Sequence, residues 1–435
     1  MKERAYDAFD SVDRPSAGLI EDCVHCGFCL SACPTYRVTG NELDSPRGRI
    51  YLMKPASEGK IPMGGSLVKH LDMCLGCLAC EPACPSGVQY GRLIEAGRSQ
   101  IERRFERPFF DKLHRSIIFS LFPYPGRLRL LLPLFYLYRK LGIRKLVGSS
   151  GMLKAISPGL AQMEGMLPEV DSPTVPGALP DAVPARGKRR YRVALLTGCM
   201  QSVFFSRTNE ATVRVLAENG CEVLVPRNQG CCGALSVHSG RLSEGRDFAR
   251  FLIRSFEGLD VDAIIVNSAG CGSTMKEYGE LLADDPVFAG PAEHVSGKTK
   301  DVMEFLGDIG LAGELKELDL KITYQDACHL GHAQRIKDQP RDVLRQIPGI
   351  RFTELPEAEL CCGSAGIYNM VEPEMSLKLL ERKLSHLKET GADYLVAGNP
   401  GCLLQIGKGI KQHGLDIKTA HPVELLDLSY RGIAK

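Results

Sequence analysis

The feature that most constrains this chain is a run of four cysteines followed by proline, which occurs twice before residue 90. The first run is Cys23-Val-His-Cys26-Gly-Phe-Cys29-Leu-Ser-Ala-Cys33-Pro34, and the second is Cys74-Leu-Gly-Cys77-Leu-Ala-Cys80-Glu-Pro-Ala-Cys84-Pro85. Two residues between successive cysteines let one tight loop direct three thiolates at three corners of a cubane. The fourth cysteine reaches the other cluster from the following helical turn. The doubled spacing therefore predicts two [4Fe–4S] clusters.

The crossed fourth ligand predicts which cysteines share a cluster. One cluster takes Cys23, Cys26, Cys29 and Cys84, and the other takes Cys74, Cys77, Cys80 and Cys33. Zinc is the alternative metal, but zinc sites usually pair two C-x₂₋₄-C units and have no use for the third cysteine, the fourth cysteine and the proline.

Three arginines, Arg37, Arg47 and Arg49, lie between the two cysteine runs. Positive side chains beside anionic clusters would raise the reduction potentials of those clusters. Charged side chains more often lie in solvent, so we expect each of the three on a solvated basic surface.

Composition and charge exclude several other classes of protein. The 435 residues include 54 Lys or Arg and 52 Asp or Glu, so the formal net charge of +2 gives no electrostatic reason for a nucleic-acid partner. The first residues, MKERAYDAFD, lack the basic-then-apolar pattern of a secretory signal, which favours a cytoplasmic protein. In that reducing compartment the 17 cysteines indicate metal binding rather than disulfides. The longest uncharged runs of the most apolar stretch, Ser116–Gly126 and Leu130–Tyr138, are shorter than the about 20 residues of a transmembrane helix.

The chain divides into four parts. Residues 1–105 hold both cysteine runs and are expected to form a two-cluster ferredoxin-like domain. Residues 106–190 lack cysteine, and nine of the 26 prolines fall between Pro123 and Pro184, which predicts a helical and proline-rich linker that is extended over 172–190. Strand and helix signals then alternate over 191–315, and again over 316–435, as two cysteine-rich domains.

The two later parts repeat one arrangement of cysteines. Cys199, Cys231 and Cys271 precede Cys328, Cys361 and Cys402 by 129, 130 and 131 residues, and this agreement indicates an internal duplication. Each copy holds a lone cysteine, a Cys-Cys-Gly and a further cysteine. The candidate cluster ligands are Cys199, Cys231, Cys232 and Cys271 in the first copy and Cys328, Cys361, Cys362 and Cys402 in the second. Buried free thiols that pack as small hydrophobes are the alternative, but they do not explain the matched register.

Strands separated by helices within each copy predict a small parallel sheet. The expected fold class is therefore α+β multidomain, with an N-terminal α-helical 2×[4Fe–4S] ferredoxin domain followed by duplicated α/β cysteine-rich domains. In such sheets sites form beyond the strand ends, so we expect each repeat cysteine in a loop. Cys221 opens a strand and is interpreted as structural. His329 and His332 are expected to form local hydrogen bonds, with proton relay or iron ligation as the alternative.

The repeat carries a resemblance to a known family. The segments TGC, GCCGA, NSAGCG, ACHLGH, LCCGSAG and NPGC resemble the cysteine-rich domains of heterodisulfide reductase and related iron–sulfur subunits. In the fullest form of that motif the last element is C-x-x-C, and five cysteines hold a non-cubane cluster. Thr274 and Gln405 stand here at the position of the fifth cysteine. The resemblance therefore implies one or two additional iron–sulfur clusters, and four cysteines per copy allow a conventional four-thiolate cluster.

Over most of its length the chain resembles one family of subunits. VHCGFC with CPTY, LDSPRGRIYLMK and CPSGVQY resemble the iron–sulfur subunit of bacterial glycolate oxidase. The resemblance implies that flavin-containing partner subunits oxidise glycolate to glyoxylate. This subunit would then pass the electrons toward a membrane quinone, either from the cytoplasm or from the inner face of the cell membrane.

Two other functions stay open. The same electron-transfer role serves lactate or glycerol-3-phosphate dehydrogenases, and a thiol–disulfide reductase resembling heterodisulfide reductase is a further alternative. The sequence has no G-x-G-x-x-G after a strand and no Walker loop. Hydroxyacid oxidation needs a hydride-accepting cofactor. We therefore assign no catalytic residue and do not expect this chain to oxidise glycolate alone.

Overall fold

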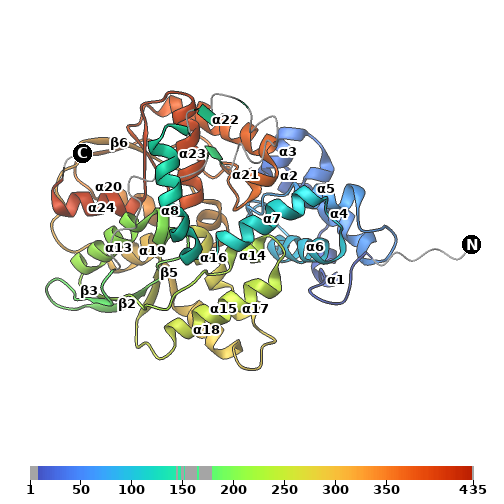
Figure 1. Ribbon diagram of the computed structural model, residues 1–435, viewed down its shortest axis with the longest axis horizontal. Helices are drawn as coiled ribbons and strands as arrows, with labels where there is room; N and C mark the ends of the chain where they lie inside the picture. The colour runs from blue at the N-terminus through green and yellow to red at the C-terminus, as the bar shows by residue number, and fades with distance from the viewer. Residues whose placement is uncertain (1–7, 144–145, 148–150, 152–163, 166–178, 434–435) are drawn as a thin grey trace, which may run out of the picture.

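The computed structural model describes residues 8–143, 146–147, 151, 164–165 and 179–433. Short helices form the N-terminal domain, drawn in blue in Figure 1. They are α1 (Ala17–Glu21), α2 (Cys29–Ala32), α3 (Pro34–Thr39), the 3₁₀ turn η1 (Glu42–Asp44), α4 (Pro46–Ser57), α5 (Gly65–Asp72) and α6 (Tyr90–Arg104). The α4 start follows from its sequence, because the Ser45 hydroxyl accepts a hydrogen bond from Gly48 N at 3.1 Å and Pro46 occupies the first helical position.

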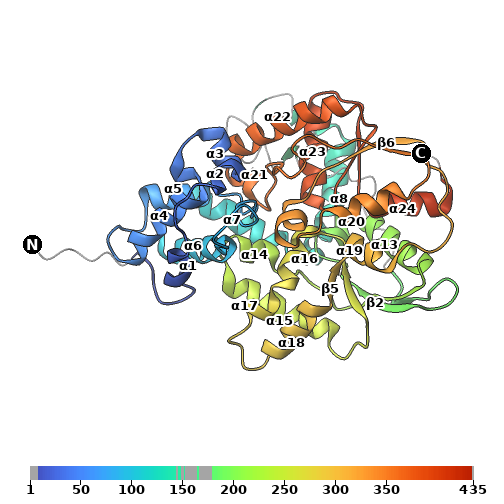
Figure 2. The same ribbon diagram turned by 180° about the vertical axis from the view of Figure 1, so that it is seen from behind.

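The first half of the expected linker is helical. It forms α7 (Phe109–Leu121) and α8 (Pro125–Lys140), which lie over the face turned toward the viewer in Figure 1 and are seen behind the other elements in Figure 2. Residues 172–178 of the proline-rich stretch expected to be extended fall outside the described residues. Its end forms β1 (Ala182–Val183), which pairs antiparallel with β3 (Cys221–Leu224).

Two sheets follow, with the same strand order in their parallel parts. The first contains β2 (Tyr191–Leu195), β3, β4 (Ala263–Val266) and β5 (Thr299–Asp301), in the order β1-β3-β2-β4-β5. The second contains β6 (Leu320–Tyr324), β7 (Ile350–Phe352), β8 (Tyr394–Val396) and β9 (Lys418–Ala420), in the order β7-β6-β8-β9. The matching order confirms the predicted α/β fold with two parallel sheets.

Helices cover both sheets. In the first copy they are α12 (Gln201–Phe204), α13 (Ser206–Glu218), α14 (Ala234–His238), α15 (Leu242–Phe256), α16 (Ala269–Lys276), α17 (Tyr278–Leu281), α18 (Ala289–Lys298) and α19 (Val302–Ile309). In the second they are the π-helical turn η2 (His329–Ala333), α20 (Asp338–Arg345), α21 (Tyr368–Val371), α22 (Pro373–Thr390), α23 (Pro400–Gln412) and α24 (Pro422–Arg431). One core, which includes Val193, Leu216, Ile322 and Leu425, joins the two copies.

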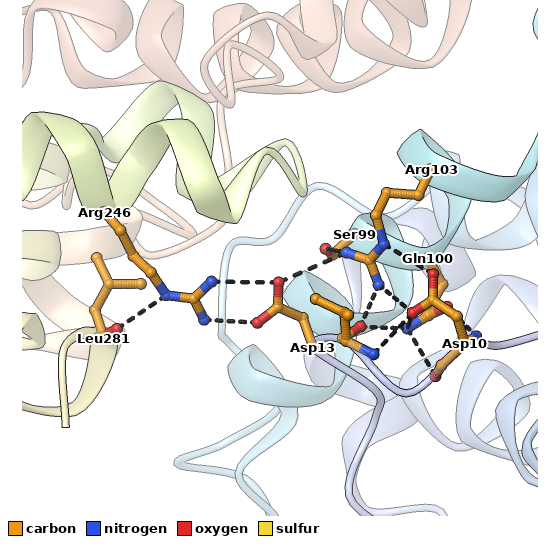
Figure 3. Close-up of polar contacts among 8 residues, drawn as sticks. Asp10, Asp13, Ser99, Gln100, Arg103, Arg246 and Leu281 are labelled. Carbon is orange, nitrogen blue, oxygen red and sulfur yellow. Dashed lines mark hydrogen bonds and ion pairs between the residues drawn. The ribbon is translucent and has the colours of Figure 1, made fainter. Parts of the chain in front are cut away.

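The N-terminal domain lies against both copies (Figures 1 and 2). Figure 3 shows its contact with the first copy, where Arg246 of α15 donates two hydrogen bonds to Asp13, at 2.6 and 3.3 Å. Arg103 of α6 contacts the same carboxylate and also Asp10. Arg37 of α3 pairs with Glu357 of the second copy. The Arg246–Asp13 and Arg37–Glu357 pairs thus join the domain to both copies of the repeat.

Removing the Arg246 side chain is expected to weaken this contact. The pair is bidentate and Asp13 is only 12% exposed, so we expect Arg246→Ala to lower the free energy of unfolding by about 1–2 kcal/mol. The urea midpoint of the anaerobic protein measures the change. Arg227→Ala is the control, because the Arg227–Asp181 pair is 80% and 55% exposed and solvent screens its contribution to stability. Equal midpoints for the two variants would contradict the prediction.

Candidate metal centres

The two ferredoxin loops have the same backbone conformation. His25 and Gly27 follow Cys23 with φ of 54° and 89°, and Gly76 and Leu78 follow Cys74 with φ of 63° and 59°. Left-handed φ is costly for His and Leu, and both loops accept it at matched positions. The loops therefore curve in the way that directs successive thiols to one side.

The first loop gathers a thiol from the second run. Burial raises the pKa of the Cys23 thiol, and the nearby thiols of Cys84 and Cys26 raise it further. Cys26 is exposed, whereas Cys23, Cys29 and Cys84 are half-buried. The sequence-predicted set thus lies at the surface of the domain.

The second loop gathers a thiol from the first run. Cys33, Cys74, Cys77 and Cys80 line one small cavity of about 20 Å³, together with Arg49 and Tyr90. The Tyr90 hydroxyl donates to Cys74 Sγ at 3.5 Å. Burial raises the pKa of the Cys80 thiol well above its usual value, and the neighbouring thiols raise it further.

Arg49 is buried beside this cavity, so its expected place in solvent is wrong. It is 1% exposed, donates to His70 O at 2.7 Å and to Thr35 Oγ1 at 3.0 Å, and lies 3.9 Å from Cys33 Sγ. Burial lowers the pKa of this guanidinium, but the negative charges of Cys74 and its neighbours raise it overall. A buried cation needs an anion close by, and a cluster held by four thiolates supplies one. The donor set and its charge balance therefore fit a [4Fe–4S] cluster.

The other two arginines have ordinary partners. Arg37 is exposed and pairs with Glu357. Arg47 is half-buried, pairs with Glu42 and donates to His25 O at 2.9 Å in the first loop.

In each copy of the repeat, the four cysteines form a chain of sulfur contacts. Cys199 Sγ lies 3.7 Å from Cys231 Sγ. Contacts continue from Cys231 to Cys232 and from Cys232 to Cys271. The second copy repeats the order, from Cys328 through Cys361 and Cys362 to Cys402. The matched contacts show that the duplication extends to the arrangement of the thiols.

A glycine after each cysteine pair fixes the turn. Gly233 and Gly363 have φ of 85° and 86°, a region that other residues rarely adopt. A Cβ at Gly233 would lie 2.9 Å from Gly245 O, and one at Gly363 would lie 2.6 Å from Ser376 O. Only glycine suits either position, which explains why Cys-Cys-Gly occurs in both copies.

All the repeat cysteines line a single cavity of about 510 Å³. They are Cys199, Cys231, Cys232, Cys271, Cys328, Cys361, Cys362 and Cys402. Cys77 of the second ferredoxin loop lines the same cavity, so this residue borders both hollows. Leu128, Leu131 and Phe135 of α8 form part of the apolar wall. The sequence predicted one set of four ligands in each copy of the repeat, and in the structure both sets line the same cavity.

Two repeat cysteines are not in loops as expected. Cys271 and Cys402 lie in the first turns of α16 and α23, because each helix begins directly after Ser268 or Asn399 at the strand end. Asn399 Nδ2 donates to Cys402 Sγ at 3.6 Å. Both thiols still face the cavity at the strand ends, as the topology of a parallel sheet predicts.

The residues at the fifth-cysteine positions face elsewhere. Gln405 is fully buried and donates to Ser376 Oγ at 2.9 Å. Thr274 Oγ1 lies 3.3 Å from His238 Nε2. Neither residue is among those that line the cavity.

The two histidines next to Cys328 donate hydrogen bonds to backbone carbonyls. His329 Nε2 donates to Gly76 O of the second ferredoxin loop at 3.0 Å, and its ring packs edge-on against His238. His332 Nε2 donates to Glu359 O at 3.1 Å. The His329 contact, which sequence analysis missed, ties the ferredoxin loop to the repeat.

Among the described residues, no three His, Cys, Asp or Glu side chains converge closely enough to ligate one metal ion. A cubane places each thiolate on a different iron, so its ligands need not meet at one point. Cys221 is buried at the start of β3 and does not line the cavity, as expected of a structural residue.

The ferredoxin domain, the linker and both copies of the repeat each match a known protein family. A 4Fe-4S dicluster domain matches residues 19–88, which implies two [4Fe–4S] clusters. A cysteine-rich domain matches twice, at 193–276 and 322–407. The linker region of the glycolate oxidase iron-sulfur subunit matches 110–167.

Full-length relatives decide the family. The chain is 41% identical over 424 residues to the probable glycolate oxidase iron-sulfur subunit of Bacillus subtilis, covering 95% of each chain. The chain belongs to the glycolate oxidase iron–sulfur subunit family. It is also 33% identical over 406 residues to the glycolate oxidase iron-sulfur subunit of Escherichia coli, covering 92% of this chain and 93% of that one. The resemblance found in the sequence is thereby confirmed.

As a member of this family the chain is an iron–sulfur electron-transfer subunit, and a subunit implies further chains in its complex. These matches favour this family over lactate or glycerol-3-phosphate dehydrogenase subunits and over a thiol–disulfide reductase. A solved structure, a hypothetical protein from Helicobacter pylori, is similar in fold with a TM-score of 0.53 at 11% identity, covering 88% of this chain and 66% of that chain. None of the helices in the described part of the chain has the length and apolar character needed to cross a membrane.

Proposed function

We propose that this chain carries electrons from flavin-containing subunits, which oxidise glycolate to glyoxylate, through its ferredoxin domain and its cysteine-rich repeat toward a membrane quinone. The observation that carries the proposal is the position of Cys77, which lines both the ferredoxin cavity and the cavity of the repeat. Centres held on either side of this residue would be close neighbours. The clusters would supply one-electron chemistry.

The candidate ligands form three groups. Cys23, Cys26, Cys29 and Cys84 would hold the surface cluster, and Cys33, Cys74, Cys77 and Cys80 the inner one. The place of Cys84 beside Cys23 and the cavity shared by Cys33 support this crossed assignment. The eight repeat cysteines would hold one or two additional clusters, which the matched sulfur contacts support.

Electron entry fits the surface cluster. Cys26 is exposed, and Val24 and Phe28 in the same loop are 68% and 65% exposed. Tyr51, also 65% exposed, packs edge-on against His25. Exposed apolar side chains that gather around a redox centre are suited to a protein partner, and we assign this surface to the flavin-containing subunits.

The isolated chain is expected to show no glycolate-dependent dye reduction, because a hydride acceptor must come from a partner. The flavin-containing subunits should restore the activity when they are added back. Transfer of electrons from the chemically reduced chain to the dye provides the control, since it shows that the clusters are intact. Glycolate-dependent activity without any flavoprotein would contradict the proposed division of labour.

A further inference from the structure

Helices α7 and α8 carry a second apolar stripe that no described part of the chain covers. The exposed leucines are Leu130, Leu134 and Leu137 of α8 and Leu141 directly after it, which are 81%, 60%, 49% and 63% exposed. Their spacing places them on one side of the helix. The opposite side of α8 packs its Leu128 and Leu132 against Val203.

The neighbouring helix continues this surface. Phe109, Phe110, Leu113 and Ile117 of α7 are 71%, 81%, 46% and 40% exposed, while Ile118 and Phe119 are buried against the second copy of the repeat. Arg127 Nη1 donates to Ser120 O at 2.6 Å and joins the two helices. Both lie over one face of the molecule (Figures 1 and 2). Exposed apolar area of this extent marks an interaction surface.

The charged residues of α8 are all basic, whereas α7 also carries Asp111 in its first turn. Residues 112–143 contain six Lys or Arg and no Asp or Glu, although the whole chain has almost equal numbers of the two. Arg129 and Lys140 are exposed on α8 beside the leucines. Leucine and phenylalanine on one side of a helix, with basic residues alongside, are typical of helices that lie in the interface of a bilayer. Basic side chains are attracted there by anionic lipids.

We propose that the exposed stripes of α7 and α8 dock this subunit onto an anionic phospholipid bilayer, with α8 lying in the interface. The other side of α8 supplies Leu128, Leu131 and Phe135 to the wall of the cysteine-lined cavity. Docking would therefore place that cavity one helix away from the lipid phase, where an apolar quinone resides. The link between docking and quinone access rests on the proposed function, whereas the binding of lipid by α7 and α8 does not.

Flotation of the anaerobically prepared chain with vesicles tests the proposal without substrate or partner. We expect the chain to float with vesicles of phosphatidylglycerol and phosphatidylethanolamine. Binding to phosphatidylcholine vesicles should be about tenfold weaker, because these lack the negative surface charge. Leu134→Glu should lower binding by about tenfold or more. Val287→Glu is the matched control, since Val287 is 70% exposed on the first copy of the repeat.

A charge-reversal pair tests the electrostatic part. Arg129→Glu/Lys140→Glu should weaken binding to the anionic vesicles by about tenfold or more. Lys378→Glu/Lys388→Glu, which changes two exposed lysines of α22, should leave binding unchanged. An unchanged visible absorption spectrum shows that each variant keeps its folded clusters.

Three results would overturn the proposal. They are failure of the wild-type chain to float, equal flotation of Leu134→Glu and Val287→Glu, and loss of copurifying flavin-containing subunits in Leu134→Glu with vesicle binding intact. The last result would show that the stripe is a protein interface. Glycolate-dependent dye reduction by the complex checks the proposed function separately, and Leu134→Glu is expected to leave it unchanged.

Discussion

The Cys361→Ser and Cys231→Ser variants are expected to lose the iron that the anaerobic protein holds beyond the about eight atoms of its two cubanes. Cys361 lies between Cys328 and Cys362 in the chain of sulfur contacts, and Cys231 has the same place in the first copy. Serine at this central position removes one thiolate and interrupts the chain. The ferredoxin EPR signals should persist, because neither cysteine belongs to the ferredoxin ligand sets.

Oxygen should remove the same iron first. The resembling motif uses a fifth cysteine, whereas Thr274 and Gln405 stand here and neither lines the cavity. A cluster that lacks one expected thiolate is completed differently or is more open to attack. We therefore expect the iron content to fall toward about eight atoms in air before the ferredoxin signals decline.

Cys221→Ser is the matched control for both variants. Cys221 is a fully buried cysteine of the first copy that takes no part in the sulfur contacts, so its replacement should leave the iron content unchanged. An iron content of about eight under strict anaerobiosis, with all the repeat thiols open to alkylation, would contradict cluster binding by the repeat. The repeat would then act as a docking module for the flavin-containing subunits.

The sequence predicted best what is encoded by local spacing. The two cysteine runs and the 129- to 131-residue register of the repeat are visible in a single chain, and the parallel sheets follow from alternating strand and helix signals. The strands β5 (TKD) and β9 (KTA) gave no such signal. They are short and polar, and they pair only because β4 and β8 offer them an edge.

Features that depend on tertiary packing were not predicted. Arg49 shares a face of α4 with buried Pro46 and Met53, so the helical pattern carried a usable signal. The anionic site that accepts its charge, however, comes from Cys74 and Cys33 in separate runs. The double role of Cys77 depends on docking of the N-terminal domain against the repeat, through contacts such as His329 to Gly76 and Arg246 to Asp13. Neither contact leaves a pattern in the sequence.

The second large effect is expected when the fourth ligand of either ferredoxin cluster is replaced by serine. Cys33→Ser should remove the inner cluster, because Cys33 shares its cavity with Cys74, Cys77 and Cys80. Arg49 would then be left buried beside an incomplete anionic site, so the loss should be nearly complete and the ferredoxin iron should fall by about half. Cys84→Ser should instead remove the surface cluster, since Cys84 lies beside Cys23.

Two reference variants make this comparison decisive, because Cys26 and Cys77 each lie within the run that wraps one cluster. The EPR spectrum of Cys33→Ser should match that of Cys77→Ser, in which the inner cluster is damaged, and the spectrum of Cys84→Ser should match that of Cys26→Ser. If the fourth cysteine of each run served its own loop, the matches would be exchanged, and Cys33→Ser would resemble Cys26→Ser. The geometry opposes that outcome, because Cys33 borders the hollow formed by the second run while Cys26 is exposed at the surface.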